Sequence, residues 1–222
     1  RILQSKKITQ LKVATTTEEG SVFIAAVADK CGVGYHKGSV DDVLDRFYQT
    51  AKPENPDYVV RLTSDCPLID PTIIDETIQY AIDGDYDYVH TDSICFPDGL
   101  DTEVFKFSAL ERAWKEAGMT SEREHVTPYI WKNGSAYGGD KFKSANLQNS
   151  LGVYPAKDYR ITIDEPEDFE VIKTLIEHIG IEKTWKEYID YYESHEEVRN
   201  LNSKFGYNEG YDKSIKNDKK IK

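Results

Sequence analysis

The sequence has 222 residues, of which 39% are hydrophobic and 12% are aromatic, and this is enough apolar material for one sizeable core. The 40 acidic residues outnumber the 28 basic ones and give a formal net charge of -12. A surface of this sign repels the phosphates of nucleic acids and of anionic lipids. We therefore expect neither a nucleic acid nor a membrane among the partners of this chain.

Three cysteines, Cys31, Cys66 and Cys95, are widely spaced and form no C-x-x-C pair. This spacing argues against a disulfide framework and against a zinc knuckle. No apolar run approaches the ~20 residues that span a bilayer, and the first residues lack the apolar stretch of a signal peptide. The sequence therefore predicts a cytoplasmic protein.

The first third of the chain predicts strands that alternate with helices. Short β-branched runs are typical of strands, and apolar residues at helical spacing are typical of the helices between them. In chain order, the pattern predicts a strand at 11–16, a helix at 21–31, a strand at 33–35, a helix at 40–51 and a strand at 58–62. This βαβαβ order predicts an α/β fold with a parallel sheet.

The remaining two thirds predict a less regular, mixed arrangement. Asp70 fits a helix cap before Pro71 at the first helical position, and Ser108 is expected to cap a later helix. Strands are expected at 86–91, 102–107, 141–147 and 159–163, and helices at 70–81, 109–117, 121–128, 165–179, 182–194 and 196–205. Residues 1–206 are predicted to form one domain, and the lysine-rich residues 207–222 to form a flexible tail.

Two aspartates follow predicted strands, Asp65 after 58–62 and Asp164 after 159–163. Ligands of open parallel sheets bind beyond the carboxyl ends of the strands. Carboxylates at such an edge suit Mg²⁺, which takes one or two of them and completes its shell with water and phosphate oxygens. Asp164 with Glu167 is also a good helix cap with a capping-box partner. Both roles remain open on pattern alone.

Other candidates carry weaker signals. Asp85 and Asp87 form a D-x-D triplet of the kind found in metal-dependent glycosyltransferases, but the triplet precedes its strand, and short matches are common in an acidic sequence. His125 lies among polar residues, where a functional and a structural role are equally compatible. The acidic loop at 98–103 could receive sugar hydroxyls or could be a solvated turn. Dinucleotide-binding, P-loop, zincin and nucleophile-elbow motifs are absent.

Several ordered motifs resemble those of the CTP-dependent sugar cytidylyltransferases, the family of acylneuraminate and KDO cytidylyltransferases, and within it the SpsF type of spore-coat polysaccharide biosynthesis. The resemblance runs nearly end to end. It lies in V-A-T-T at 13–16, K-G-S at 37–39, D-D-V-L-D-R at 41–46, V-R-L-T-S-D-C-P-L-I-D at 60–70, F-P-D-G-L-D at 96–101, E-V-F at 103–105, S-E-R-E-H-V-T-P-Y at 121–129, D-E-P-E-D-F at 164–169, and N-E-G-Y at 208–211 with K-S at 213–214.

The resemblance implies a GT-A-like nucleotide-diphosphosugar transferase fold, with a mixed, mostly parallel sheet flanked by helices. It also implies transfer of CMP from CTP to a sugar acid, with release of pyrophosphate. The residues that fall on family positions are Asp65 and Asp164 for Mg²⁺ and catalysis, Thr15, Lys37 and Ser39 for the nucleotide, and Asp101, Glu103, Glu124 and His125 for the sugar.

The sequence departs from the family at its start, because no strand and Gly/Arg/Lys-containing loop for the triphosphate precedes Arg1. We therefore expect this chain alone to bind CTP poorly and to turn over negligibly. The alternatives are a GT-A glycosyltransferase that uses Asp85 and Asp87, and a catalytically inactive subunit that binds nucleotide sugars. The acceptor sugar is not readable from the sequence, and a homodimer is compatible with it.

Overall fold

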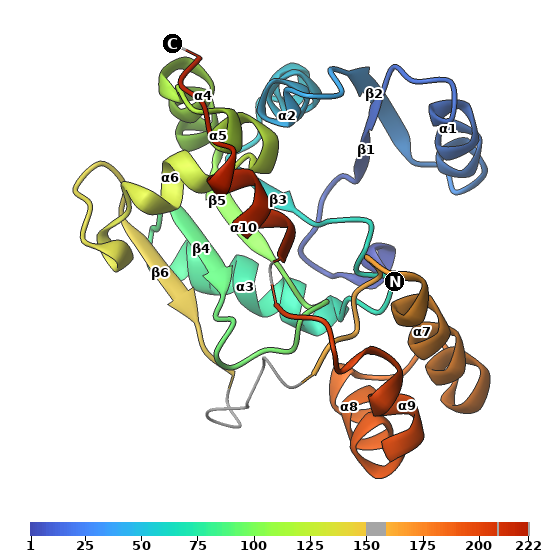
Figure 1. Cartoon of the computed structure of the whole chain (residues 1–222). Coiled ribbons are helices and arrows are strands. Elements are labelled where there is room, and N and C mark those ends of the chain that lie inside the picture. Colours follow the sequence, from blue (N-terminus) through green and yellow to red (C-terminus); the bar gives the residue numbers. More distant parts are fainter. Residues whose placement is uncertain (150–158, 208, 222) are drawn as a thin grey trace.

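The computed structural model describes residues 1–149, 159–207 and 209–221. Strands β1 (Lys12–Thr16) and β2 (Gly34–Gly38) pair in parallel as a separate two-stranded sheet. The main sheet has the order β3-β5-β4-β6, with β3 (Tyr58–Arg61), β4 (Tyr88–Thr91), β5 (Glu103–Lys106) and β6 (Ser144–Leu147). Strands β3, β4 and β6 run in one direction and β5 runs against them. This confirms the mixed α/β fold (Figure 1).

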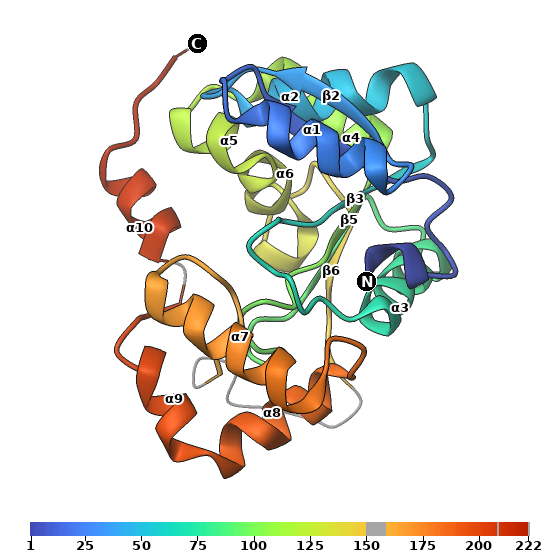
Figure 2. The ribbon, with the colours of Figure 1, turned by 90° about the vertical axis from the view of Figure 1, so that its right-hand side faces the viewer.

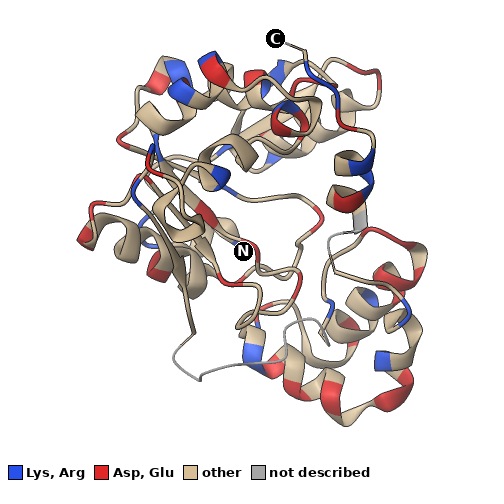
Figure 3. Cartoon of the chain, turned by 60° about the vertical axis from the view of Figure 1, so that its left-hand side comes forward, with Lys and Arg blue, Asp and Glu red and all other residues tan. Residues whose placement is uncertain are grey.

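Helices cover the sheets on several sides (Figures 1 and 2). They are α1 (Ser21–Lys30), α2 (Val43–Ala51), α3 (Pro71–Asp83), α4 (Phe107–Glu116), α5 (Thr120–His125), α6 (Pro128–Lys132), α7 (Pro166–Ile179), α8 (Trp185–Ser194), α9 (Glu196–Asn202) and α10 (Glu209–Lys216). Within the described ranges, no helix is long and apolar enough to cross a membrane. Acidic residues occur throughout the helical regions and are frequent on α7 to α9 (Figure 3).

The two faces of the main sheet have different roles, because side chains alternate between them along each strand. On one face, Val89 and Val104 are fully buried against Ile74 and Ile78 of α3. On the other face, Tyr88 and Phe105 join a core with α2, α4 and α6. This second face also carries the polar residues at the strand ends and is called the pocket face below.

The carboxyl-terminal helices form a third core over the loops that follow β3 and β4. Val171 and Leu175 of α7 and Ile189 of α8 are buried together with Leu68 and Leu100 of these loops. Helices α7, α8 and α9 lie together below the sheet in Figure 2. Apolar packing therefore fixes the loops that carry the polar strand ends.

Three details differ from the sequence-based prediction. β1 and β2 are parallel, as predicted, but β3 pairs with β5 and not with them. Residues 159–163 form no strand of a sheet, because their backbone bonds go to two loops, at Asp98 and Asp65. The cap of α4 is Lys106 and not Ser108, because Phe107 already has helical geometry.

Residues 207–222, predicted as a flexible tail, contain α10 and are tied to α5. The carboxylate of Asp218 accepts hydrogen bonds from the Thr120 hydroxyl (2.8 Å) and from the backbone N–H (2.9 Å) and hydroxyl (2.7 Å) of Ser121. The backbone N–H of Ile221 donates to the carbonyl of Gly118 (2.7 Å). Asp218 thus receives three donors at the start of one helix, where a carboxylate is favoured.

Asp70 is predicted to contribute to stability at two places. Its carboxylate caps α3 by accepting from the N–H of Thr72, as expected from the sequence, and it also accepts from the buried N–H of Trp185 in α8 (2.8 Å). The substitution Asp70→Ala removes the cap and leaves that N–H unpaired, so it should lower the free energy of unfolding by about 2 to 4 kcal/mol. Urea denaturation measures the loss. The control Asp83→Ala, at the exposed end of α3, should change it by less than about 0.5 kcal/mol.

Candidate active site

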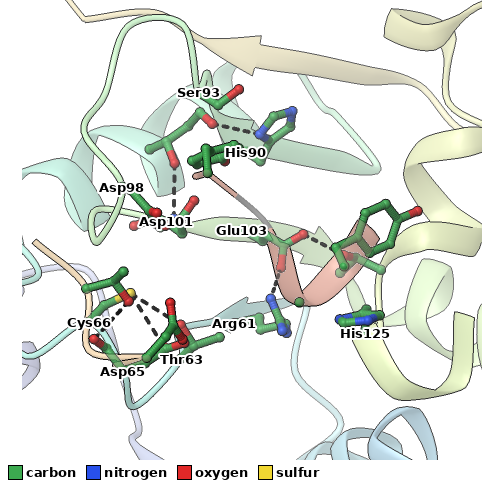
Figure 4. Close-up of a pocket in the computed structure, with 18 of the residues that line it drawn as sticks. Arg61, Thr63, Asp65, Cys66, His90, Ser93, Asp98, Asp101, Glu103 and His125 are labelled. Carbon is green, nitrogen blue, oxygen red and sulfur yellow. Dashed lines mark hydrogen bonds and ion pairs between the residues drawn. The ribbon is translucent and has the colours of Figure 1, made fainter. Parts of the chain in front are cut away.

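A cavity of about 590 Å³ opens on the pocket face, beyond the carboxyl ends of β3 and β4. Its wall comes from the loops after these strands, from α5 and α6, from the segment before α7 and from α10. The part drawn in Figure 4 has Asp65, Asp98 and Asp101 on one side and Arg61 and His125 on the other. The pocket therefore has an acidic end and a nitrogen-rich end.

The acidic end is built by a backbone contact that joins distant parts of the chain. The N–H of Ile163 donates to the carbonyl of Asp65 (2.8 Å), and the hydroxyl of Thr162 donates to the same oxygen (3.1 Å). Asp164 follows at once, so both aspartates line one pocket. The structure brings these two residues together as the sequence predicted, although 159–163 is not a sheet strand.

Asp164 is not the cap of α7. The helix begins at Pro166 with Glu165 as its cap, and Asp168 completes a capping box by accepting from the N–H of Glu165 (2.9 Å). The alternative role of Asp164 with Glu167 is therefore wrong. The carboxylate of Asp164 is half exposed and pairs with Arg160 (2.7 Å).

Arg160 binds three carboxylates at the acidic end. Its guanidinium makes two hydrogen bonds of 2.8 Å to the fully buried Asp168, one of 2.7 Å to Asp164 and one of 3.1 Å to Asp98. Asn202 of α9 donates to Asp168 (2.9 Å) and to the backbone carbonyl of Arg160 (3.0 Å). The planar guanidinium suits this bidentate contact, which a lysine cannot reproduce.

Two further carboxylates at this end are crowded and buried. Burial, followed by repulsion from Asp101, raises the pKa of Asp98 to about 7, against the opposing effect of Arg160. Burial also raises the pKa of Asp101, although the N–H of Gly99 donates to its carboxylate (3.2 Å). The acidic end therefore has an excess of negative charge, which a cation would relieve.

A polar row crosses the sheet at the floor of the pocket. The strand register pairs Glu103 of β5 with Arg61 of β3 and with His90 of β4. Glu103 accepts from Arg61, from the Tyr88 hydroxyl (2.6 Å) and from the Thr127 hydroxyl (2.6 Å). Burial would raise the pKa of Glu103, but the charge of Arg61 and these hydrogen bonds outweigh it and lower the pKa. Glu103 thus holds its neighbours in place.

His125 enters the pocket from the end of α5 through a strained turn. Val126 has φ 74° and ψ -58°, and the N–H of Thr127 donates to the carbonyl of His125 (2.9 Å), which is a γ-turn with positive φ. This conformation is rare for a β-branched residue, and such strain concentrates at functional sites. Burial lowers the pKa of His125 and favours the neutral ring. Its neighbour Glu124 is exposed and does not line the pocket.

The residues predicted for the nucleotide lie elsewhere. Thr15 and Lys37 are register partners in the β1–β2 sheet, and Ser39 follows β2. The Ser39 hydroxyl accepts from the N–H of Asp42 (3.0 Å), so it supports the start of α2. None of the three lines the pocket.

The D-x-D aspartates also lie outside the pocket. Asp85 and Asp87 precede β4, whereas the pocket follows it. Both pair with Lys106, at 2.7 and 3.1 Å, and the Asp85 side chain is 83% exposed. These contacts are those of a surface turn.

Within the described residues, no group of three or more His, Cys, Asp or Glu side chains is arranged as a complete metal site. Two of the predicted ligands, the carboxylates of Asp65 and Asp164, line the same open pocket. This set fits Mg²⁺, which needs few protein ligands when phosphate oxygens and water supply the others. The three cysteines are free, as the sequence predicted, and Cys66 and Cys95 are buried.

The chain resembles known proteins along most of its length. A sequence profile of the family described as Cytidylyltransferase matches residues 1–203. The chain belongs to this family. This chain is therefore a nucleotidyltransferase with a mixed α/β fold, as the sequence motifs predicted.

The chain is also similar to individual proteins over most of its length. The cytidylyltransferase is 36% identical over 204 residues to an uncharacterised protein of Methanocaldococcus jannaschii, covering 91% of this chain and 81% of that protein. It is 33% identical over 171 residues to the spore coat polysaccharide biosynthesis protein SpsF of Bacillus subtilis, covering 77% and 68%. A solved cytidylyltransferase from Leptospira borgpetersenii superposes with a TM-score of 0.80 at 31% identity, covering 89% and 82%.

Sequence reasoning missed several pocket residues of the cytidylyltransferase. Arg61 and His90 lie within strands, and only the register shows that both flank Glu103. Arg160 lies in the segment taken for a strand. Tyr211 and Lys213 belong to the tail motifs of the family resemblance, which gave them no role in the site, and both line the pocket. A polar residue inside an otherwise apolar strand was the available signal for Arg61 and His90.

Arg160 is predicted to be required for stability of the acidic end. The substitution Arg160→Met leaves the buried Asp168 charge without its cation, so the free energy of unfolding should fall by about 3 to 5 kcal/mol. Arg160→Lys keeps the charge but not the paired hydrogen bonds. Its free energy of unfolding should lie between those of the wild type and Arg160→Met. Urea denaturation gives the values. The control is Lys204→Met at the exposed pair with Glu167, for which a change above about 1 kcal/mol is not expected.

The raised pKa of Asp98 predicts a pH-dependent effect of Asp98→Asn. The folded protein binds this proton more tightly than the unfolded chain, whose ordinary value is 3.8. The contribution of Asp98 to the free energy of unfolding therefore falls as the pH rises from about 4 to about 7. Above about pH 7, the full cost of burying the charged carboxylate is present. In metal-free buffer, the melting temperature of Asp98→Asn should exceed that of the wild type by more at about pH 8 than at about pH 5. An equal gain at both values would contradict the prediction, and the exposed Asp29→Asn serves as the control.

Proposed function

We propose that this cytidylyltransferase transfers CMP from CTP to a sugar acid, in the synthesis of a surface or spore-coat polysaccharide, with Mg²⁺ held by Asp65 and Asp164. The observation that supports this most directly is the bond between the N–H of Ile163 and the carbonyl of Asp65, which places both aspartates at one end of one pocket. The relation to the Bacillus subtilis spore-coat protein supports the polysaccharide pathway.

The reaction joins an acceptor hydroxyl to the α-phosphorus of CTP and breaks the bond to the β-phosphate. The proton of the hydroxyl is released and pyrophosphate leaves. Bound Mg²⁺ would supply positive charge to the triphosphate and the leaving group. The role of the protein is then to position the two substrates and to exclude water, and no covalent enzyme intermediate is needed.

The residues of this chain divide between these tasks. Asp65 and Asp164 would hold the metal end. The carboxylates of Asp98 and Asp101 add negative charge that favours a cation there. At the other end, Glu103 orients Arg61, and His125 presents a neutral ring to the acceptor. Thr15, Lys37, Ser39 and Glu124 lie outside the lining of this pocket, and their roles toward the nucleotide and the sugar stay predictions.

The glycosyltransferase alternative has less support. Asp85 and Asp87 pair with Lys106 at a surface turn that precedes β4. A D-x-D metal site needs both carboxylates beside a nucleotide pocket, and the described pocket lies at the opposite end of the strand.

A binding experiment tests the metal site and separates the two alternatives. The variants Asp65→Asn and Asp164→Asn should each weaken Mg²⁺-dependent CTP binding by about ten-fold or more, because each removes a charged ligand. The variant with both Asp85→Asn and Asp87→Asn should bind as the wild type does. Isothermal titration of CTP with Mg²⁺, repeated with EDTA, gives the affinities, and pyrophosphate release is measured beside it. The opposite ranking of the variants would refute the proposal.

A further inference from the structure

We propose that helix α10 forms the acceptor side of the active site, and that Lys213 is a positioning residue for the negatively charged group of the acceptor sugar. This inference rests on the proposed function and adds a residue and a structural element to it. Gly210, Tyr211 and Lys213 of α10 line the same pocket as Asp65 and Asp164. In Figure 2, α10 lies between α5 above and α7 and α9 below.

An aromatic contact seats α10 against the nitrogen-rich end. The ring of Tyr211 packs edge-to-face on His125, with 5.0 Å between ring centres, and its centre lies 6.2 Å from that of Trp131. The ammonium of Lys132 lies 5.8 Å from the centre of the same ring. Aromatic pairs of this geometry are favourable beyond the area that they bury. Helix α10 is thus packed on His125, which precedes the strained turn at Val126.

The charges of the pocket assign a role to Lys213. Among the pocket-lining cations of the described ranges, Arg61 pairs with Glu103, and Arg160 pairs with Asp98, Asp164 and Asp168. Lys213 is exposed and has no ion pair with any described residue. Its ammonium is therefore available to an anion, in a pocket whose other cations are already neutralised by carboxylates.

Unpaired polar atoms at the same wall point to a ligand as well. The Nε2 atom of His125, the hydroxyl of Tyr211 and the Nε atom of Arg61 are buried, and none has a hydrogen-bond partner within the described part of the chain. Buried polar atoms normally have partners. Three unpaired atoms in residues that line one pocket suit a polar ligand between α5, β3 and α10, such as a sugar with several hydroxyls.

The carboxyl-terminal anchor explains how α10 is held there. Asp218 accepts three hydrogen bonds from Thr120 and Ser121, at the start of the helix that ends in His125. The wall residue and the anchor therefore belong to one short helix, α5. Loss of the anchor should release α10 while the sheet and its cores stay intact.

Lys213→Met tests the role of the charge. With Mg²⁺ and CTP bound, it should weaken the binding of N-acetylneuraminate and KDO by about ten- to a hundred-fold, the effect of one charge-assisted hydrogen bond. Its affinity for Mg²⁺ and CTP should not change, which separates a failure of this inference from a failure of the metal site. Lys213→Arg should retain most of the affinity. Lys216→Met, on the same helix but outside the pocket lining, is the matched control. Calorimetry measures the three variants and the wild type.

Asp218→Ala tests the anchor without altering the pocket lining. It should reduce sugar-acid affinity as Lys213→Met does, with little change in melting temperature or in CTP affinity. Equal sugar-acid affinity of the Lys213→Met and Lys216→Met variants overturns the proposal. A parallel loss of CTP affinity in Lys213→Met also overturns it, since Lys213 would then contact the triphosphate. The proposal is also overturned if neither N-acetylneuraminate nor KDO binds the wild type at millimolar concentration.

Discussion

The pocket depends on one buried cation. The guanidinium of Arg160 joins Asp98 of the loop after β4 to Asp164 and Asp168 at the start of α7, and Asn202 of α9 completes the set. A buried ion pair adds little net stability compared with apolar packing, but its loss leaves a charge without a partner. The geometry of the acidic end is therefore closely defined, because Arg160 can satisfy three carboxylates in only a narrow range of arrangements.

Much of the fold follows from local sequence signals. The period of apolar residues and the Asp70-Pro71 cap predict α3 and its starting point, and the ends of β3 and α7 are close to their predicted positions. The prediction of a strand at 159–163 is wrong because an extended, apolar run looks the same whether its partners are strands or loops. The predicted cap of α7, Asp164, lies one residue before the cap in the structure. Pro166 favours the first helical position, and this signal indicated Glu165.

The site was predictable only where position along one strand decides it. Asp65 and the acidic loop around Asp101 follow strands, so the rule that ligands gather at strand ends found them. Arg61, His90 and Arg160 act through partners far away in the sequence, and no local pattern reports which strands are neighbours. The contacts of Glu103 could not be predicted either, because its three donors come from β3, β4 and the turn after α5. Sequence patterns identified the acidic end of the pocket but few of the residues at its nitrogen-rich end.

The order of elements along the chain separates the two ends of the pocket in time. Proteins are synthesised from the amino terminus, and segments begin to fold as they emerge. The main sheet and the loop that carries Asp65 are complete before α7 appears, and Arg160 then fixes the acidic end. Helix α10 follows, and Asp218 reaches back 97 residues to Ser121. Such long-range closure is slow relative to local folding, so a nascent chain passes through a state in which the carboxylates are assembled but the wall that carries Lys213 is not.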